Sequence, residues 1–312
     1  MILGPTAAGK TKLAVRLAAR FNGEIISADS RQVYRGMDIG TGKDLEEYDI
    51  KVKSQKSKVK INNKIKYHLI DIVSPKSDFN VAKYQRLAYR AIDDILERGK
   101  QPFLVGGAGL YIDAVIKGYR FSPPAKKCPM SNVQCPKIRN KLNLWSHQKL
   151  LNKLKQIDPR TYNTIDKKNR RRVQRAVEIY YETGRPKSRQ PELANPDYDI
   201  LIIGVKYPLE KIYEKIDQRL KLRLEQGMIT EVKRLHQAGT SWKKLESFGL
   251  EYKQVALYLQ GKLDYEQMFE QLKNAIHHFA KRQLTWFKRN EKIIWSDDYL
   301  QPAGLVKKFL EK

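Results

Sequence analysis

The stretch Gly4-Pro5-Thr6-Ala7-Ala8-Gly9-Lys10-Thr11 matches the pattern G-x-x-x-x-G-K-[ST], which forms a loop around phosphate groups. Its glycines let consecutive backbone N–H groups turn toward an anion, Lys10 adds a positive charge, and the Thr11 hydroxyl suits Mg²⁺. The residues that follow, as far as Arg20, have an amphipathic helical pattern, and the N-terminus of that helix would complete the anion site. The eight residues of the loop are therefore predicted to bind a diphosphate, which need not be ATP.

The order of elements around this loop predicts an α/β fold. Only residues 1–3 precede the loop, so the strand that leads into it is expected to be short. Further strands are predicted at residues 24–28, 68–72, 102–105 and 199–205, and helices at 81–98, 209–238 and 265–290. A second glycine-rich turn, residues 106–111, also connects a strand to a helix, which indicates a parallel sheet. Residues 51–66 contain seven lysines and are predicted to form a hairpin that turns at Asn62-Asn63.

A change of composition divides the chain. Prolines interrupt the sequence from about residue 119, and a basic, helical region continues to about residue 198. We therefore expect a P-loop NTPase-like core with a parallel sheet, formed by residues 1–118 and 199–312. A helical domain, residues 119–198, is predicted to be inserted into it.

The charge of the chain indicates its partners. The 312 residues include 61 Lys and Arg but 34 Asp and Glu, a net charge of +27 that favours polyanions. The chain contains two cysteines, Cys128 and Cys135, too few for a disulfide framework. No secretory signal or membrane-spanning run is recognisable, so we expect a cytoplasmic protein that does not bind membranes. The high net charge leads us to expect a monomer.

Several side chains could carry chemistry at the rim of the predicted sheet. Asp29 and Ser30 follow a strand, and ligands bind where parallel strands end. Asp29 could act as a base, ligate Mg²⁺ or only cap a turn. Arg219 and Arg223 lie four residues apart, so they could face a diphosphate or form part of an exposed helical face. The basic stretches 167–175 and 281–289 combine cations with aromatic or amide side chains, a mixture that suits RNA.

These motifs together resemble the tRNA dimethylallyltransferase family. The resemblance includes the phosphate loop, residues 29–34 (Asp-Ser-Arg-Gln-Val-Tyr) and 37–41, the turn at 106–111, residues 171–178 (Arg-Arg-Val-Gln-Arg-Ala-Val-Glu) and residues 280–286 (Ala-Lys-Arg-Gln-Leu-Thr-Trp). The blocks occur in the family's order over nearly the whole chain. The resemblance implies transfer of a dimethylallyl group from dimethylallyl diphosphate to the N6 amine of the adenosine 3′ to the anticodon of tRNA.

The resemblance also implies roles for particular residues. Asp29 would be the base, while Lys10, Arg219 and Mg²⁺ on Thr11 would neutralise the departing diphosphate, and Thr6 would orient the substrate or leaving group. The inserted helical domain would cover the anticodon stem-loop. The residues implied to contact tRNA are Asp29, Ser30, Arg31, Gln32, Ala108, Arg171, Arg172, Val173, Gln174, Arg175, Lys281 and Arg282.

Two positions depart from the family pattern. Ala108 replaces a Thr whose hydroxyl is expected near tRNA, and Asp44 replaces a Pro at the end of a loop. Three other functions remain open from the residues alone. They are a P-loop kinase for a small metabolite, a prenyltransferase for free adenine nucleotides, and a non-catalytic RNA-binding protein.

Overall fold

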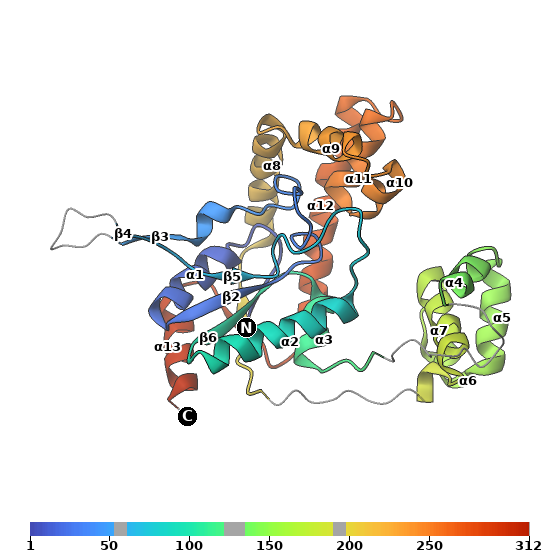
Figure 1. Cartoon of the computed structure of the whole chain (residues 1–312), viewed down its shortest axis with the longest axis horizontal. Coiled ribbons are helices and arrows are strands. Elements are labelled where there is room, and N and C mark those ends of the chain that lie inside the picture. Colours follow the sequence, from blue (N-terminus) through green and yellow to red (C-terminus); the bar gives the residue numbers. More distant parts are fainter. Residues whose placement is uncertain (53–60, 122–134, 190–197, 312) are drawn as a thin grey trace. The chain divides into compact units, whose positions relative to one another are not determined.

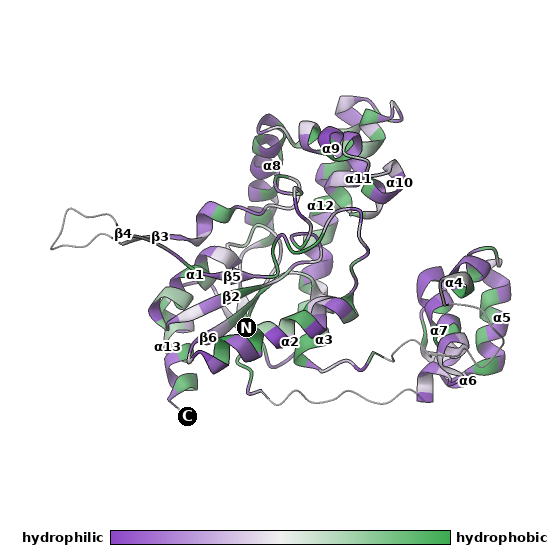
Figure 2. Cartoon of the chain, in the orientation of Figure 1, coloured by the Kyte–Doolittle hydropathy of each residue, from purple (hydrophilic) through white to green (hydrophobic). Residues whose placement is uncertain are grey.

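The computed structural model describes residues 1–52, 61–121, 135–189 and 198–311 (Figure 1). The chain divides into two compact units, Met1–Ile116 with Pro196–Lys312 and Lys117–Asn195. Hydrophobic and hydrophilic residues alternate along the helices of both units (Figure 2), as expected for helices that bury one face. Within the described ranges, no helix combines the length and the hydropathy needed to cross a membrane.

A six-stranded sheet forms the centre of the larger unit. Its strands in spatial order are β5 (Tyr67–His68), β2 (Gly23–Ala28), β6 (Gln101–Gly106), β1 (Ile2–Leu3), β7 (Ile203–Val205) and β8 (Ile294–Ser296). All neighbouring pairs are parallel. The parallel α/β sheet predicted from the sequence is confirmed, and its first strand has two residues.

Helices cover both faces of this sheet because its strands alternate their buried side chains. Ile2 and Ile25 face one apolar cluster, with α1 (Lys10–Arg20) and α13 (Leu300–Leu310). Leu3 and Ile26, the next residues along the same strands, face a second cluster with α2 (Val81–Glu97) and α3 (Gly109–Ile116). Because successive side chains of a strand point to opposite faces, the sheet carries a layer of helices on each face, which makes three layers. The loops lie at the ends of the strands.

A third apolar cluster joins a group of helices to the loop that follows β2. Val33, Tyr34 and Met37 of that loop are buried against these helices. The helices are α8 (Leu209–Glu225), α9 (Met228–Gln237), α10 (Trp242–Ser247), α11 (Leu250–Leu259) and α12 (Tyr265–Phe287). The position of the loop at the end of the sheet thus depends on residues about 200 positions later in the chain.

Several predicted elements differ from the observed ones, and the strand predicted at 199–205 is observed as β7 over Ile203–Val205 alone. The strand predicted at 68–72 ends at His68, because Leu69 and Asp71 adopt positive φ values of 63° and 57°. The helix predicted at 209–238 is two helices, separated at Gly227, whose φ is 97°. The hairpin at residues 51–66 exists as β3 (Asp49–Val52) and β4 (Ile61–Lys64), preceded by the 3₁₀ helix η1 (Leu45–Tyr48). Its turn is not at Asn62-Asn63, since both residues pair within the ladder, and it lies outside the described residues.

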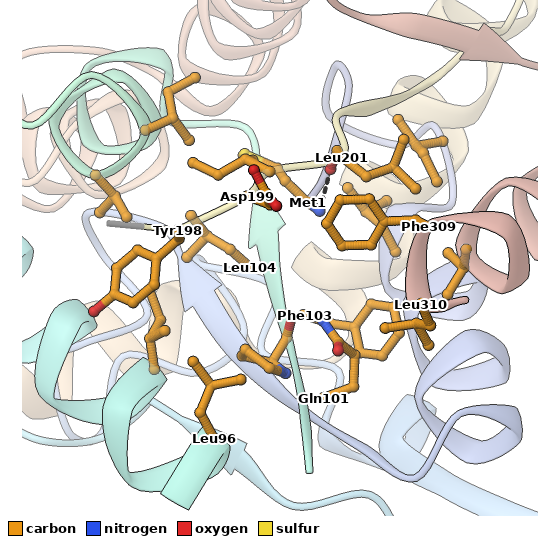
Figure 3. A pocket seen from close by; sticks show the side chains of 18 residues that line it. Met1, Leu96, Gln101, Phe103, Leu104, Tyr198, Asp199, Leu201, Phe309 and Leu310 are labelled. Atoms are coloured by element: carbon orange, nitrogen blue, oxygen red, sulfur yellow. Dashed lines mark hydrogen bonds between the residues drawn. The ribbon is translucent and has the colours of Figure 1, made fainter. Parts of the chain in front are cut away.

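An apolar pocket of about 420 Å³ lies near the amino ends of the central strands (Figure 3). Phe103 and Leu104 of β6 and Phe309 and Leu310 of α13 contribute to its wall. The Met1 amino group donates a hydrogen bond to the Leu201 carbonyl there, at 2.7 Å. Among the described residues that line it, Tyr198 and Asp199 are the ones with titratable side chains, and the rest of the lining is mostly apolar.

The smaller unit is helical and contains a fourth apolar cluster. Its helices are α4 (Cys135–Asn143), α5 (His147–Ile157), α6 (Pro159–Thr164) and α7 (Arg170–Thr183), followed by the 3₁₀ helix η2 (Lys187–Arg189). Leu142, Leu150 and Leu154 pack against Val173 and Val177 in its core. Cys128 lies outside the described residues.

Candidate functional site

The phosphate loop has the backbone conformation of an anion site. Ala7 and Gly9 have φ values of 61° and 84°, so residues of opposite backbone handedness alternate before α1 begins at Lys10. Such alternation turns successive N–H groups to one side and forms a concave site for an anion. The Lys10 ammonium group folds back over the loop and donates to the Pro5 carbonyl at 2.6 Å. The loop therefore has the shape of a phosphate-binding site.

Gln283 of α12 connects this loop to the second glycine-rich turn. The Thr6 N–H donates to Gln283 Oε1 at 2.9 Å, and Gln283 Nε2 donates to the Gly107 carbonyl at 2.8 Å. A Cβ atom on residue 107 would lie 2.4 Å from Gln283 Nε2, so a side chain there would displace the Gln283 amide from this position. The Gln283 side chain is buried and spans the loops that follow β1 and β6. The sequence analysis assigned it no function.

Arg219 of α8 contacts the same loop and has a lowered pKa. Its Nη2 donates to Thr6 Oγ1 at 2.8 Å. Burial, and then the nearby charge of Arg223, lower the pKa of Arg219 to about 10. Burial and the charge of Arg219 lower the pKa of Lys10 to about 8. Two cations that repel each other are thus held beside the loop, which favours binding of an anion between them.

Asp29, the residue after β2, begins a tight turn. Its Oδ1 accepts hydrogen bonds from the N–H groups of Arg31 at 2.8 Å and Gln32 at 3.3 Å. These two hydrogen bonds orient the carboxylate through Oδ1. The other oxygen, Oδ2, is therefore the one that could contact a ligand. Arg31 forms an ion pair with Glu251 at 2.7 Å. Gln32 accepts from Ser27 Oγ and donates to the Gly42 carbonyl.

The loop from residue 36 to residue 44 is fixed by a buried carboxylate of α9. The Glu231 side chain accepts hydrogen bonds from the N–H groups of Asp38, Ile39 and Gly40 at 2.8, 2.8 and 3.1 Å, and from the Tyr252 hydroxyl at 2.6 Å. A charge that is 4% exposed is stable only when it is hydrogen-bonded this completely. The loop is therefore held in place at its start.

Two cavities meet beside the phosphate loop. The first, of about 470 Å³, is called here the phosphate-loop cavity and includes Lys10 and Thr11 in its lining. The second, of about 420 Å³, is called the adjoining cavity and includes Ser30 and Ala108. Seven residues line both cavities: Thr6, Asp29, Thr41, Gly107, Arg219, Phe279 and Gln283. We call these seven residues the junction.

Acidic groups near the phosphate loop include residues that the sequence analysis missed. Glu47 lines the phosphate-loop cavity with Asp44, and burial together with the Asp44 charge raises the pKa of Glu47. Within the described ranges, no group of three or more His, Cys, Asp or Glu side chains is arranged to hold a metal. Thr11, Asp44 and Glu47 thus line the same cavity with oxygen-bearing side chains.

Arg223 of α8 is a buried cation with an incomplete set of partners. It is 6% exposed, and among the described residues its Nη2 finds no hydrogen-bond acceptor. The nearest ion-pair partner of Nη2 is Asp44, whose Oδ2 lies 3.9 Å away. Arg223 lines the adjoining cavity and is not part of an exposed helical face.

The basic run predicted at residues 171–175 lies on α7 of the smaller unit. Arg171 and Arg172 are exposed, whereas Val173 is fully buried in the helical core and its side chain cannot contact a ligand. Gln174 and Arg175 donate to the buried carboxylate of Glu178, each at 3.1 Å. Arg171 and Arg172 are therefore the members of the run that are best placed to bind a phosphate backbone.

The second basic run and Ala108 belong to the larger unit. Lys281 and Arg282 are exposed on α12, and Arg282 lines the adjoining cavity. Ala108 also lines that cavity, directly before α3. The larger unit thus brings Asp29, Ser30, Arg31, Ala108 and Arg282 to one cavity, while residues 171–175 belong to the separate smaller unit.

Comparison with known proteins gives consistent results. A family model described as IPP transferase matches residues 32–290. A protein named tRNA dimethylallyltransferase 1 from Syntrophus aciditrophicus (strain SB) is 48% identical over an alignment of 309 residues, which covers 96% of this chain and 94% of that protein.

Solved structures share the fold. The crystal structure of the full-length tRNA isopentenylpyrophosphate transferase from Bacillus halodurans is 36% identical, with a TM-score of 0.66 over 99% of this chain and 94% of that chain. A eukaryotic dimethylallyltransferase acting on tRNA has a TM-score of 0.79 over 99% of this chain and 78% of that chain. Its identity is 24%, so it supports the fold alone.

Proposed function

The chain belongs to the IPP transferase family, and from this we propose that it transfers a dimethylallyl group from dimethylallyl diphosphate to tRNA. The acceptor is the N6 amine of the adenosine 3′ to the anticodon, and diphosphate is released. One observation carries the proposal: a phosphate-binding loop and a carboxylate, Asp29, meet where two cavities join. An enzyme that transfers a group from a diphosphate donor to a second substrate needs such an arrangement.

The phosphate-loop cavity suits the diphosphate of the donor. During transfer the bond between C1 of the dimethylallyl group and the diphosphate oxygen breaks, and its electrons leave with the diphosphate. Lys10, Arg219 and the N–H groups of the loop would neutralise the charge that develops. Thr6 would be oriented by Arg219, whose guanidinium group already donates to its hydroxyl oxygen.

The same cavity fits Mg²⁺ by the nature of its donors. Mg²⁺ prefers oxygen ligands and usually combines one or two protein groups with substrate phosphates. The Thr11 hydroxyl would hold it, with the Glu47 and Asp44 carboxylates in the same lining. When bound, the ion would withdraw electrons from the departing diphosphate.

The adjoining cavity suits the acceptor base. A base must leave its stack before it can enter such a site. As the new bond forms between N6 and C1, the amine loses a proton, and Asp29 Oδ2 would accept it. Ser30, Arg31, Gln32 and Ala108 would contact the tRNA around that base.

The remaining tRNA would bind through its phosphates. Arg171, Arg172, Lys281 and Arg282 are exposed, and Gln174 and Arg175 lie on the same helix as the first two. We propose that residues 119–198 act as a lid on the anticodon stem-loop. Because tRNA is the proposed substrate, we place the protein in the cytoplasm, and its charge of +27 favours a monomer.

The test is a transfer assay with three acceptors. The protein is incubated with Mg²⁺ and radiolabelled dimethylallyl diphosphate, together with tRNA that lacks the modification, AMP or ATP. We expect label in tRNA at the adenosine 3′ to the anticodon and none in the nucleotides. Label in AMP or ATP would indicate a nucleotide prenyltransferase. ATP consumption with a small acceptor and no label in tRNA would indicate a kinase.

A further inference from the structure

The junction of the two cavities contains one apolar side chain. Of the seven residues that line both cavities, Gly107 has no side chain, and Thr6, Asp29, Thr41, Arg219 and Gln283 are polar. The exception is Phe279 of α12. A hydrocarbon group that passes from a diphosphate in one cavity to an amine in the other must cross this junction, where a single aromatic ring can cover it.

The position of Phe279 on α12 directs its ring toward the reacting groups. Residues three and four apart lie on the same face of a helix. Phe279 is four residues before Gln283, which bonds to Thr6 and Gly107, and three residues after Ile276, which lines the adjoining cavity. The ring therefore lies one turn from the side chain that fixes the phosphate loop.

The Phe279 ring is held by cations and not by the core. The guanidinium carbons of Arg31 and Arg282 each lie 5.9 Å from the centre of the ring, within the range of a cation–π contact. The residue is half-buried, and it belongs to none of the four apolar clusters of the described residues. Packing of the fold therefore does not account for a phenylalanine at this position.

We propose that the Phe279 ring binds the dimethylallyl group at the junction and limits the length of the prenyl chain that the site accepts. This inference rests on the proposed function. The ring would cover the two methyl groups and keep C1 directed toward the adjoining cavity. A longer prenyl group would meet the ring, which Arg31 and Arg282 hold in place.

The test compares two donors in four proteins. The donors are dimethylallyl diphosphate and the ten-carbon geranyl diphosphate, with unmodified tRNA as acceptor. The proteins are the wild type, Phe279→Ala, Phe279→Leu and Phe269→Ala. Phe269 is the matched control, because it lies on the same helix, packs against an apolar cluster and contacts a cation, Lys273, but lines neither cavity.

Phe279→Ala should lower kcat/KM for the dimethylallyl donor and raise the geranyl-to-dimethylallyl ratio about tenfold or more, since small differences in apolar volume discriminate on this scale. Phe279→Leu, which keeps most of the apolar volume, should change the ratio far less. The affinity for inorganic pyrophosphate should be unchanged in both variants, because the loop N–H groups, Lys10 and Arg219 are the groups proposed to bind phosphate, and the apolar ring adds no charge or hydrogen bond to them. Phe269→Ala should keep the wild-type ratio even where it lowers stability.

The outcomes separate the two proposals. If the wild type labels tRNA but Phe279→Ala keeps the wild-type ratio, the inference about Phe279 is wrong and the proposed function stands. An equal change of the ratio in Phe269→Ala would also overturn the inference, because it would show a general effect of loosening α12. If the wild type does not label tRNA, the proposed function fails and the inference fails with it.

Discussion

Strand β2 carries a carboxylate at each end, and the two carboxylates have opposite surroundings. Near the amino end, Glu24 is 1% exposed and accepts hydrogen bonds from Arg98, Lys100 and His68. Arg98 contributes most to holding its pKa well below the usual range. Beyond the carboxyl end, Asp29 accepts two backbone N–H bonds and lines both cavities.

The cations at the two ends differ in the same way. Those at Glu24 are neutralised by the protein itself, whereas Lys10 and Arg219 are half-buried near each other and have lowered pKa values. A charge that is paired inside the protein stabilises the fold, and a charge that is not fully paired is available to a ligand. The comparison predicts that substitutions at the amino end change stability and that those at the carboxyl end change activity.

The largest effect is expected for Asp29→Asn. Asparagine can accept the same two backbone hydrogen bonds through its carbonyl oxygen, so the turn and the melting temperature should be retained. It cannot accept the amine proton, and loss of a general base lowers rates by about 10²- to 10⁴-fold. Single-turnover transfer to tRNA measures the effect. A rate within threefold of wild type would remove Asp29 from the role of base.

The next largest effect is expected for Glu24→Gln, and it concerns stability. Removing one partner of a buried ion pair costs about 3–5 kcal/mol, but Arg98 and Lys100 are one-third exposed and can be hydrated, so we expect about 2 kcal/mol. Urea unfolding measures this change, and kcat should be unaffected. Asp94→Asn is the control, because it removes the exposed partner of the same Arg98 and should matter much less.

The pH dependence of Glu24 has a defined sign. Its pKa in the folded protein is lower than the ordinary value of 4.5, so the folded state binds fewer protons than the unfolded state as the pH falls. Its contribution is complete above the unfolded pKa and is lost progressively at more acidic pH. The stability difference between wild type and Glu24→Gln should therefore shrink below pH 4.5. A difference that stays constant would contradict the role given to this charge.

A smaller effect is expected from the titration of Lys10. With a pKa of about 8, its ammonium group loses its charge as the pH rises from 7 to 9, so affinity for pyrophosphate should fall by up to about tenfold. Calorimetric titration with pyrophosphate measures it. Lys10→Arg is the control, because arginine keeps its charge over this pH range. Any change in its affinity with pH therefore comes from titration of the pyrophosphate. Equal pH profiles in the two proteins would show that Lys10 does not bind the diphosphate.

The sequence was most informative where function and local conformation coincide. The phosphate loop, the short strand β2 and the Gly-rich turn after β6 each predict their own structure, because glycine spacing and a short run of strand-forming residues act over a few residues. Local patterns were less reliable where a single backbone angle determines where a helix or strand ends. Leu69 and Gly227 end a strand and a helix inside stretches whose hydrophobic pattern continues.

The junction could not be predicted in full, because its members come from distant parts of the chain. Arg219 and Gln283 meet Thr6 across 213 and 277 residues. The pattern at Arg219 and Arg223 is equally consistent with an exposed helical face, and no local signal distinguishes Phe279 from Phe269. Glu231 is an ordinary acidic residue in the sequence, and its role requires three N–H groups about 190 residues earlier in the chain.

The smallest predicted effect concerns Ala108, at the start of α3. The Ala108 carbonyl accepts hydrogen bonds from the N–H groups of Tyr111 and Ile112 at 2.9 and 3.0 Å, so residue 108 is the N-cap of the helix. A threonine there could also accept an N–H bond of the first turn, which stabilises a helix by about 0.5–1 kcal/mol relative to alanine. Ala108→Val adds a similar volume without the hydroxyl, and it separates capping from filling of the adjoining cavity. The melting temperature of Ala108→Thr should be higher than that of Ala108→Val. If the two variants have the same melting temperature, a hydroxyl at this position does not cap α3. It would then be free to face the adjoining cavity, where the family resemblance implies a contact with tRNA.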